Sequence, residues 1–370
     1  MKTYRAVLVG TGSIGEAHVR AVEATEGRVV LEAAVDIDAK RVGDFAKKHG
    51  IARHFTDYLA MLSEVKPDIV LVATPPGQHA DMCIAAMEAG AWALCEKPLC
   101  GSLAELDRIE AAEKRTGCFT ACIFQMRFGA VTGHLRRLAD AGHLGRPLVG
   151  VCNTLWYRDA AYYAVPWRGI WETELGGPTM GLGIHAMDHF LHLMGPWSEV
   201  RAVVRTLDRA IEVEDVSLAL VTFANGAVGS IVNSALSPRQ ETYLRLDYQR
   251  ATVELTHLYS YTRDNWKLTP VPPAQDDGLL QAWHSFPPDV GSTHGAQLNA
   301  FVADMDAKRR PLTSGDQARQ TLELLTAIYK SGFTGEIVKR GSIKPGDSFY
   351  TVLHGNRAPE RVKGEPVRLD

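Results

Sequence analysis

A lysine framed by an acidic residue and a proline is the part of this sequence best suited to chemistry. Glu96-Lys97-Pro98 follows Trp92–Cys95, a short apolar run that predicts a buried strand. Ligands of open α/β sheets bind at the carboxyl ends of the strands. A lysine at such a position can exchange a proton with a bound hydroxyl once its pKa falls towards neutrality. We therefore single out Lys97 as a candidate acid/base residue.

A glycine-rich turn near the N-terminus indicates a cofactor. The turn lies between an expected strand, Tyr4–Val9, and an expected helix, Ser13–Ala24. Its glycines allow a tight turn, close approach of a pyrophosphate and close packing of helix on strand, and the helix N-terminus offers N–H groups. The cofactor contacts predicted for this turn are Gly10, Gly12, Ser13, Ile14 and Gly15.

The acidic residue after the next expected strand bears on the identity of the cofactor. Asp36 follows Val29–Val35, where a carboxylate accepts hydrogen bonds from ribose hydroxyls. The same carboxylate repels a 2′-phosphate, so the sequence favours NAD over NADP. Lys40 and Arg41 are near enough in the sequence to leave NADP open.

Composition and charge limit the class of protein. The chain has 370 residues, 46% of them hydrophobic, and a formal net charge of −3, so it can form two cores and has no general attraction to nucleic acid or an anionic membrane. No apolar run is long enough to span a membrane, and the N-terminus shows no signal-peptide segment, so we expect a cytoplasmic location. The six cysteines form no CxxC pair, which predicts buried, reduced thiols.

The pattern of elements changes near Gln125, which predicts two domains. Before it, short apolar strands alternate with helices, as in a doubly wound parallel sheet. After it, extended runs dominate and Asn225-Gly226 predicts a hairpin, so we expect an α+β domain with an open, mostly antiparallel sheet. The predicted division is 1–124 for the dinucleotide-binding domain, 125–340 for the second domain and 341–370 for a tail.

The remaining elements follow from hydrophobic periodicity. In the first domain we expect strands over Asp68–Ala73 and Cys118–Phe124 and a helix over Leu103–Thr116. In the second domain the expected strands are Val149–Tyr157, Val200–Leu207, Val216–Phe223, Ala227–Ser234, Thr242–Asp247 and Thr252–Thr256. Met180–Met194, Gln297–Lys308 and Asp316–Phe333 are expected helices, and Leu258–Thr293 is expected to be a loop region.

Several motifs along the chain resemble those of the Gfo/Idh/MocA oxidoreductases, the family of glucose–fructose oxidoreductase and inositol dehydrogenase. They are Ala73-Thr74-Pro75-Pro76-Gly77-Gln78-His79, Cys95-Glu96-Lys97-Pro98-Leu99, Gly176-Gly177-Pro178, Gly183-Ile184-His185-Ala186-Met187-Asp188 and Pro311-Leu312-Thr313-Ser314-Gly315-Asp316. The resemblance implies a Rossmann domain and a substrate domain whose open sheet often serves oligomerisation, so a homodimer or homotetramer is expected. It also implies nicotinamide-dependent oxidation or reduction of a sugar or polyol.

The resemblance also assigns roles to single residues. It implies that Lys97 contacts the reacting hydroxyl with His185 as its partner, and that Glu96 and Pro98 set the backbone of the lysine, with a cis peptide before Pro98 as one option. The cofactor contacts expected beyond the glycine turn are Asp36, Ile37, Thr74, Pro75, His79, Glu96 and Lys97.

One position departs from the resemblance. Many polyol dehydrogenases of the family have Asp four residues before the histidine, and some sugar-nucleotide and glycoside members have Asn; this chain has Gly181. Either His185 works with Lys97 alone or another group substitutes. Trp167 to Glu174 is a candidate segment, since it resembles members that oxidise pyranosides. The substrate contacts expected are Arg127, Arg158, Tyr163, Trp167, Arg168, Trp171, Glu174, His189 and His294, although the tryptophans suit a core position equally well.

Three alternatives to this interpretation are a metal site, a glycoside-cleaving reaction and NAD binding without chemistry. His185 and His189 have a spacing that suits one metal ion, but Asp188 orienting a histidine explains the pattern as well, and we predict no metal. A relative of this kind can also cleave glycosides by oxidising a ring hydroxyl transiently, eliminating the aglycone and reusing the same NAD. A protein that binds NAD without chemistry is the third reading, and the intact Lys97 and His185 argue against it.

Overall fold

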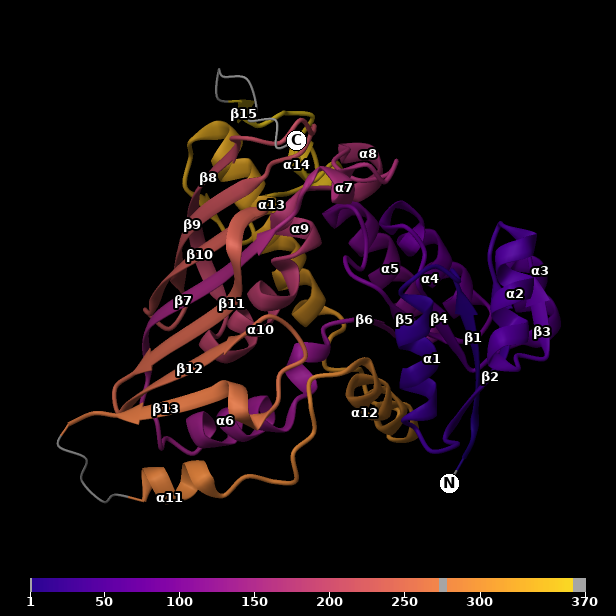
Figure 1. Cartoon of the computed structure of the whole chain (residues 1–370), viewed down its shortest axis with the longest axis horizontal. Coiled ribbons are helices and arrows are strands. Elements are labelled where there is room, and N and C mark those ends of the chain that lie inside the picture. The colour runs from indigo at the N-terminus through magenta and orange to yellow at the C-terminus, as the bar shows by residue number, and fades with distance from the viewer. Residues whose placement is uncertain (1, 273–277, 362–370) are drawn as a thin grey trace. The chain divides into compact units, whose positions relative to one another are not determined.

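The computed structural model describes residues 2–272 and 278–361, and these form two compact units (Figure 1). Unit 1 runs to Gln125 and resumes over Thr293–Arg319; unit 2 takes Met126–Ser292 and continues from Gln320. The sequence predicts a division near Gln125 and an uninterrupted second domain over 125–340, and these domain bounds stay a prediction.

Unit 1 is built on a six-stranded sheet with the order β3-β2-β1-β4-β5-β6, in which every neighbouring pair is parallel. The strands are β1 (Tyr4–Val9), β2 (Val29–Val35), β3 (Arg53–Phe55), β4 (Ile69–Val72), β5 (Trp92–Cys95) and β6 (Thr120–Cys122). The strand order reverses between β1 and β4, which is the point where such sheets bind dinucleotides. The predicted doubly wound parallel sheet is therefore confirmed.

Helices connect these strands and cover the sheet. They are α1 (Gly15–Glu23), α2 (Ala39–His49), α3 (Tyr58–Val65), the short 3-10 turn η1 (Pro76–Gln78), α4 (His79–Glu88), α5 (Leu103–Thr116) and α12 (His294–Asp306). Asp38 begins α2 by accepting a hydrogen bond from the backbone N–H of Arg41, and Gly50 ends the helix in a left-handed conformation. Both caps agree with the residue types at those positions.

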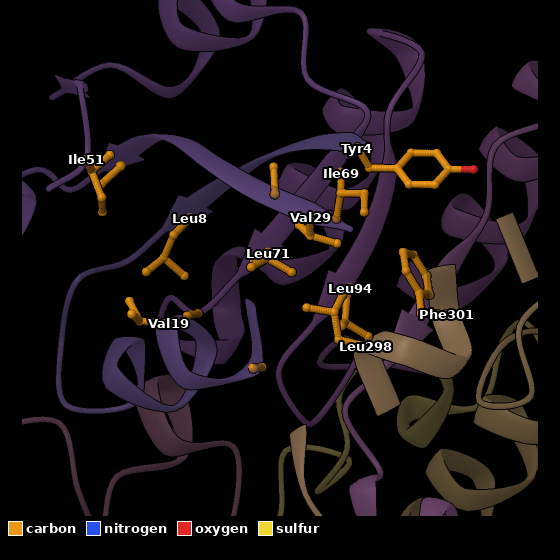
Figure 2. Packing of buried hydrophobic residues seen from close by; sticks show 14 of the residues in the cluster. Tyr4, Leu8, Val19, Val29, Ile51, Ile69, Leu71, Leu94, Leu298 and Phe301 are labelled. Carbon is orange, nitrogen blue, oxygen red and sulfur yellow. The ribbon is translucent and has the colours of Figure 1, made fainter. Parts of the chain in front are cut away.

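The return of α12 to unit 1 has a plain physical cause. Leu298 and Phe301 of this helix are almost fully buried and pack in one cluster with Ile69 and Leu94 of the sheet (Figure 2). The ring of Phe301 meets Trp92 edge to face, with centroids 5.8 Å apart. Removing this apolar area from water stabilises the unit, so a segment that is distant in sequence belongs to its core.

Unit 2 is built on a nine-stranded sheet with the path β13-β12-β11-β7-β10-β9-β8-β14, and β15 pairs with β8. The strands are β7 (Pro147–Tyr157), β8 (Trp197–Thr206), β9 (Val216–Phe223), β10 (Val228–Ser234), β11 (Leu236–Tyr248), β12 (Ala251–His257), β13 (Trp266–Pro270), β14 (Val338–Lys339) and β15 (Glu360–Arg361). Only β7–β10 and β8–β15 are parallel among the pairs described. The mostly antiparallel sheet and the hairpin at Asn225-Gly226 are as predicted.

The helices of unit 2 include three of only four residues each directly before α10. They are η2 (Gln125–Phe128), α6 (Ala130–Asp140), α7 (Ala160–Tyr163), α8 (Trp171–Glu174), α9 (Pro178–Gly181), α10 (Ile184–Met194), η3 (Arg263–Asn265), α11 (Leu279–His284), α13 (Asp316–Thr334) and α14 (Ser348–Thr351), with η2 and α13 crossing the boundary between the units. Contacts of α9 and α10 with β7, β9, β10 and β11 place this pair against the sheet.

Two stretches outside the predicted helices and strands contain regular structure. The region Leu258–Thr293 holds β13 and α11. The strand β13 forms because it pairs with β12 and so satisfies the backbone hydrogen-bonding groups along that side of β12. The tail after Lys339 holds α14 and β15, and its last residues, 362–370, lie outside the described part. All six cysteines are free and buried, as expected. Among the described residues, every helix is too short or too polar to cross a membrane.

Candidate functional site

The glycine turn after β1 has the geometry that its sequence requires. Gly10 has φ of +94°, and a Cβ there would lie 2.5 Å from the carbonyl oxygen of Ala73, so only glycine fits. A Cβ at Gly15 would lie 3.3 Å from the ring of Phe45, which keeps α1 close to its neighbours. A Cβ at Gly12 would meet nothing within 4 Å, so the backbone there is open to a ligand. The turn therefore fits a pyrophosphate at the start of α1.

Asp36 lies at the end of β2, and hydrogen-bond donors surround its carboxylate. Its Oδ2 accepts from the N–H and the hydroxyl of Thr11, both at 2.9 Å. Arg41 donates to Oδ2 from Nε at 3.0 Å and to Oδ1 from Nη2 at 2.6 Å. Burial works to raise the pKa of Asp36, but the bonds from Arg41 and Thr11 outweigh it and hold the pKa well below its usual range. A ribose hydroxyl that bound this carboxylate would compete with Arg41 for it.

The residues after β4 form a tight turn around a buried histidine. His79 is 0% exposed, and its ring nitrogens lie 2.6 Å from the carbonyl oxygen of Pro98 and 2.8 Å from that of Thr74. Burial lowers the pKa of His79, which favours the neutral ring and one N–H donor at a time. His79 therefore links the end of β4 to the segment that carries Lys97, and Thr74 and Pro75 lie in the same turn.

Glu96 is held by two histidines beside Lys97. Its Oε1 lies 3.1 Å from Nε2 of His18 and 3.1 Å from Nε2 of His294, whose rings meet edge to face. Its Oε2 lies 3.3 Å from the backbone nitrogen of Lys97, a donor, and the Lys97–Pro98 peptide is cis. Burial raises the pKa of Glu96, but the two imidazoles outweigh this and keep the pKa well below its usual range. The lysine thus follows an anionic carboxylate fixed from two sides.

His18 was not predicted as a site residue, and the substrate contact predicted for His294 stays a prediction. His18 lies on the first turns of α1, three residues after Gly15, and a polar residue on the buried side of this helix was the available signal. Two imidazoles and a carboxylate whose ligand atoms lie within 4.8 Å of one another also form a set that could hold a metal ion. The separations of 3.1 Å equally suit imidazole N–H bonds to a carboxylate, and the absence of a metal stays a prediction.

In unit 2, α10 carries His185 together with a buried ion pair. Asp188 accepts two bonds of 2.6 Å from Arg127, and both side chains are 0% exposed. Thr321 donates to the same carboxylate at 2.9 Å. Asp188 therefore anchors Arg127. The other role that the sequence suggested for Asp188, orienting a neighbouring histidine, stays a prediction.

The two histidines of α10 have different surroundings. His189 is 0% exposed, its Nε2 lies 2.9 Å from the hydroxyl of Thr132, and burial together with Arg127 lowers its pKa to about 3. His185 is 6% exposed and lies edge to face with Tyr259, with centroids 6.0 Å apart. The substrate contacts predicted for Arg127 and His189 stay predictions, and both side chains are buried inside unit 2.

The aromatic segment from Tyr157 to Glu174 divides into core and surface residues. Trp171 is 8% exposed, donates to the carbonyl of Glu212 and stacks on His354, so the core reading fits it. Trp167 is 38% exposed and lies against the guanidinium of Arg168 at 4.2 Å. The predicted contacts Arg158 and Tyr163 also lie here: the Arg158 guanidinium is 4.9 Å from the Trp156 ring, and burial raises the pKa of Tyr163.

The turn before α9 is fixed by a glutamate that the sequence analysis did not single out. Glu214 accepts from the backbone N–H groups of Gly177 and Thr179 and from the hydroxyl of Tyr329, each at 3.0 Å. A Cβ at Gly177 would lie 1.8 Å from the carbonyl oxygen of Glu214, which accounts for glycine there. Burial outweighs these bonds and raises the pKa of Glu214 to about 7. A buried acid thus fixes the backbone at the start of α9, the short helix that precedes the helix of His185.

Comparison with protein families and known proteins adds to this geometry. Residues 4–124 match the oxidoreductase family GFO_IDH_MocA with an NAD-binding Rossmann fold, and residues 132–257 match the GFO/IDH/MocA C-terminal domain. Two relatives are similar along most of their length. D-apiose dehydrogenase of Paraburkholderia graminis is 27% identical over 93% of this chain and 92% of its own, and D-glucoside 3-dehydrogenase of Escherichia coli is 25% identical over 90% and 97%.

Solved structures are similar as well. The WlbA dehydrogenase of Bordetella pertussis, in complex with NADH and UDP-GlcNAcA, matches with a TM-score of 0.80 and 27% identity, over 91% of this chain and 99% of that one. A levoglucosan dehydrogenase in complex with NADH and levoglucosan matches with a TM-score of 0.78 and 21% identity, over 92% of this chain and 100% of that one, which bears on the fold alone.

Proposed function

The chain belongs to the Gfo/Idh/MocA oxidoreductase family, and we propose that it transfers a hydride between a nicotinamide cofactor and a secondary hydroxyl of a carbohydrate. Unit 1 is an NAD-binding Rossmann domain. One observation carries the proposal. The Gly10 turn, Thr74 and Lys97 follow β1, β4 and β5, which are neighbours in a parallel sheet. All three therefore lie along the same edge of the sheet, the one formed by the carboxyl ends of its strands.

The residues at this edge fit the cofactor. The open backbone at Gly12 and the start of α1 suit the pyrophosphate, and Asp36 suits the ribose hydroxyls. Bound NAD⁺ supplies the hydride acceptor. In the oxidation, the reacting carbon loses a hydride while its hydroxyl loses a proton, so that the C–O single bond becomes a carbonyl. We assign that proton to Nζ of Lys97, with His185 of unit 2 as the second group acting on the same oxygen.

The relatives and unit 2 support the substrate class that we propose. The named relatives act on D-apiose and D-glucosides, and the exposed Trp167 offers the type of aromatic surface on which a sugar ring stacks. Arg168 and Glu174 beside it offer a donor and an acceptor for hydroxyls. We therefore propose a pyranoside or a related free sugar as the substrate.

A substrate screen tests the proposal. Methyl glucopyranosides, D-glucose, D-apiose, myo-inositol and a UDP-sugar acid are each incubated with NAD⁺ or NADP⁺, while NADH absorbance and the mass of the products are followed. We expect NADH to form together with a keto product that is two hydrogens lighter than one of the sugars. Aglycone release without net NADH would favour the glycoside-cleaving reaction instead. Tight NADH binding without conversion of any carbohydrate would overturn the proposal.

A further inference from the structure

Gly181 differs from the other glycines near His185 because nothing in the structure requires it to be glycine. A Cβ at Gly177 would lie 1.8 Å from the carbonyl oxygen of Glu214, and one at Gly183 would lie 2.0 Å from Oδ1 of Asn233. A Cβ at Gly181 would lie in ordinary contact, with Oε1 of Glu174 as its one neighbour within 4 Å, at 3.7 Å. The backbone of Gly181 also lacks the positive φ that favours glycine. A side chain would therefore fit there, and its first contact would be a carboxylate.

That carboxylate is held by two donors, one of which is a guanidinium. Glu174 is 6% exposed, its Oε2 accepts from the N–H of Gly169 at 2.6 Å, and its Oε1 accepts from Nη1 of Arg168 at 2.9 Å. Gly169 has φ of +74°, and a Cβ there would lie 2.7 Å from Ile211, so the donor at this position is fixed as well. A charge-assisted bond to a fixed donor is short and strong, which holds the carboxylate in one place.

The arginine that holds Glu174 is fixed by aromatic rings. Its guanidinium lies 3.9 Å from the centroid of the Tyr162 ring and 4.2 Å from that of Trp167, and it also donates to the hydroxyl of Tyr162. Arginine stacks on aromatic faces in this way at binding surfaces. Trp167, Arg168 and Glu174 therefore form one preorganised group, with an exposed ring at one end and a buried carboxylate at the other.

The carboxylate of Glu174 also lies beside Gly181, in the segment that leads to His185. Glu214 fixes the start of α9 at Gly177 and Thr179, and α9 ends at Gly181, four residues before His185. In a continuous helix, positions four residues apart lie on one face. Residues 182 and 183 interrupt the helix here, but the N–H of Gly183 still bonds back to the carbonyl of Pro178. Oε1 of Glu174 thus lies next to the position where a side chain of residue 181 would begin.

We infer that Glu174 is the carboxylate that acts with His185 on the substrate, reaching across Gly181 to accept a hydrogen bond from a sugar hydroxyl. A carboxylate has about four acceptor positions, so it can hold Arg168 and Gly169 and still accept from a hydroxyl. The glycine then has a function, because it leaves the contact with Oε1 to the substrate. An aspartate at 181 in the wild-type background would crowd two carboxylates together. This inference rests on the proposed function.

Four variants and one control variant test it, with the first carbohydrate that yields NADH with the wild type as the probe. Glu174→Gln is expected to lower kcat/KM by about 10- to 100-fold, the usual effect of losing a hydrogen bond to a charged group. Gly181→Ala adds a methyl group in front of Oε1 and is expected to lower kcat/KM with an unchanged or slightly raised Tm. Gly133→Ala in α6 is the matched control, because its Cβ would also lie 3.7 Å from a polar side-chain atom, Nη1 of Arg137.

The decisive variant moves the carboxylate. Glu174→Gln combined with Gly181→Asp is expected to regain at least part of the lost turnover, while Gly181→Asp alone is expected to be impaired. A purely structural Glu174 would not be rescued in this way. NADH affinity and Tm are measured for every variant, so loss of the fold is recognised separately. Wild-type turnover with Glu174→Gln within about twofold of it overturns this inference and leaves the proposed function standing. A wild type that converts no carbohydrate overturns both.

Discussion

Two buried carboxylates have different partners: Glu96 of unit 1 is held by two imidazoles, and Asp188 of unit 2 is held by a guanidinium. Glu96 lies 3.1 Å from each of two histidine nitrogens and is followed by Lys97. Asp188 is bound at two positions by Arg127, with both side chains inaccessible to solvent. An imidazole changes its protonation near neutral pH, whereas a guanidinium stays charged.

This difference separates two kinds of polar cluster. The cluster around Glu96 lies at the edge of the sheet where ligands bind, and the half-buried Lys97 is part of it. The cluster around Asp188 joins η2, α10 and α13 inside unit 2. Changes in the first are expected to affect turnover more than stability, and changes in the second the reverse.

The largest effect is expected from Lys97→Ala. Loss of the proton-transfer group lowers kcat by about 10²- to 10⁴-fold. The free energy of unfolding should change little, because the side chain is only half buried. Steady-state kinetics measures kcat, chemical denaturation measures the free energy of unfolding, and NADH fluorescence titration shows whether the variant still binds the cofactor. The exposed Lys114→Ala on α5 serves as the control. A folded, NADH-binding Lys97→Ala with near-normal kcat would show that the lysine is not the acid/base group.

Arg127→Ala should have the opposite signature. It leaves the charge of Asp188 buried and uncompensated, so the free energy of unfolding is expected to fall by about 3–5 kcal/mol in chemical denaturation. Arg127→Met combined with Asp188→Leu removes both charges and should recover most of that loss. If Arg127→Ala keeps its stability and loses only sugar binding, the pair belongs to the substrate site after all, as the sequence first suggested for Arg127.

Glu214 sharpens the comparison within unit 2, because it is as buried as Asp188 but has no cation bound to it among the described contacts. Burial raises its pKa from 4.5 to about 7, so folding favours the protonated acid. The penalty for ionising it is absent below pH 4.5 and grows to about 3 kcal/mol above pH 7. Wild-type stability should therefore fall as the pH rises through this window, relative to Glu214→Gln. Parallel pH profiles of the two proteins would contradict a titration of Glu214.

The sequence contained most of the fold but only part of the site. Strands such as Tyr4–Val9 and Val216–Phe223 were predicted to the residue, because the first apolar run ends before Gly10 and the second begins after Asp215. The position of α12 was not, since its packing against Ile69 and Leu94 depends on contacts far apart in sequence. The same limit hid His18 and Glu214, whose partners are Glu96 and the Gly177 turn. Periodicity reports a buried face and not the polar group that it meets.

The smallest effect is expected at the ribose end of unit 1, where Arg41 holds Asp36 from a side chain that is half exposed. Arg41→Ala frees the carboxylate for ribose hydroxyls while Thr11 still donates to it, so NADH should bind up to about tenfold more tightly. NADPH should bind more weakly, because a cation that could meet its 2′-phosphate is lost. Lys47→Ala is the control, since Lys47 is exposed in the last turn of the same helix. Fluorescence titration with both cofactors separates the outcomes. Parallel weakening of NADH and NADPH would mean that Arg41 contacts the part common to both cofactors, and Asp36 would then bind ribose without competition.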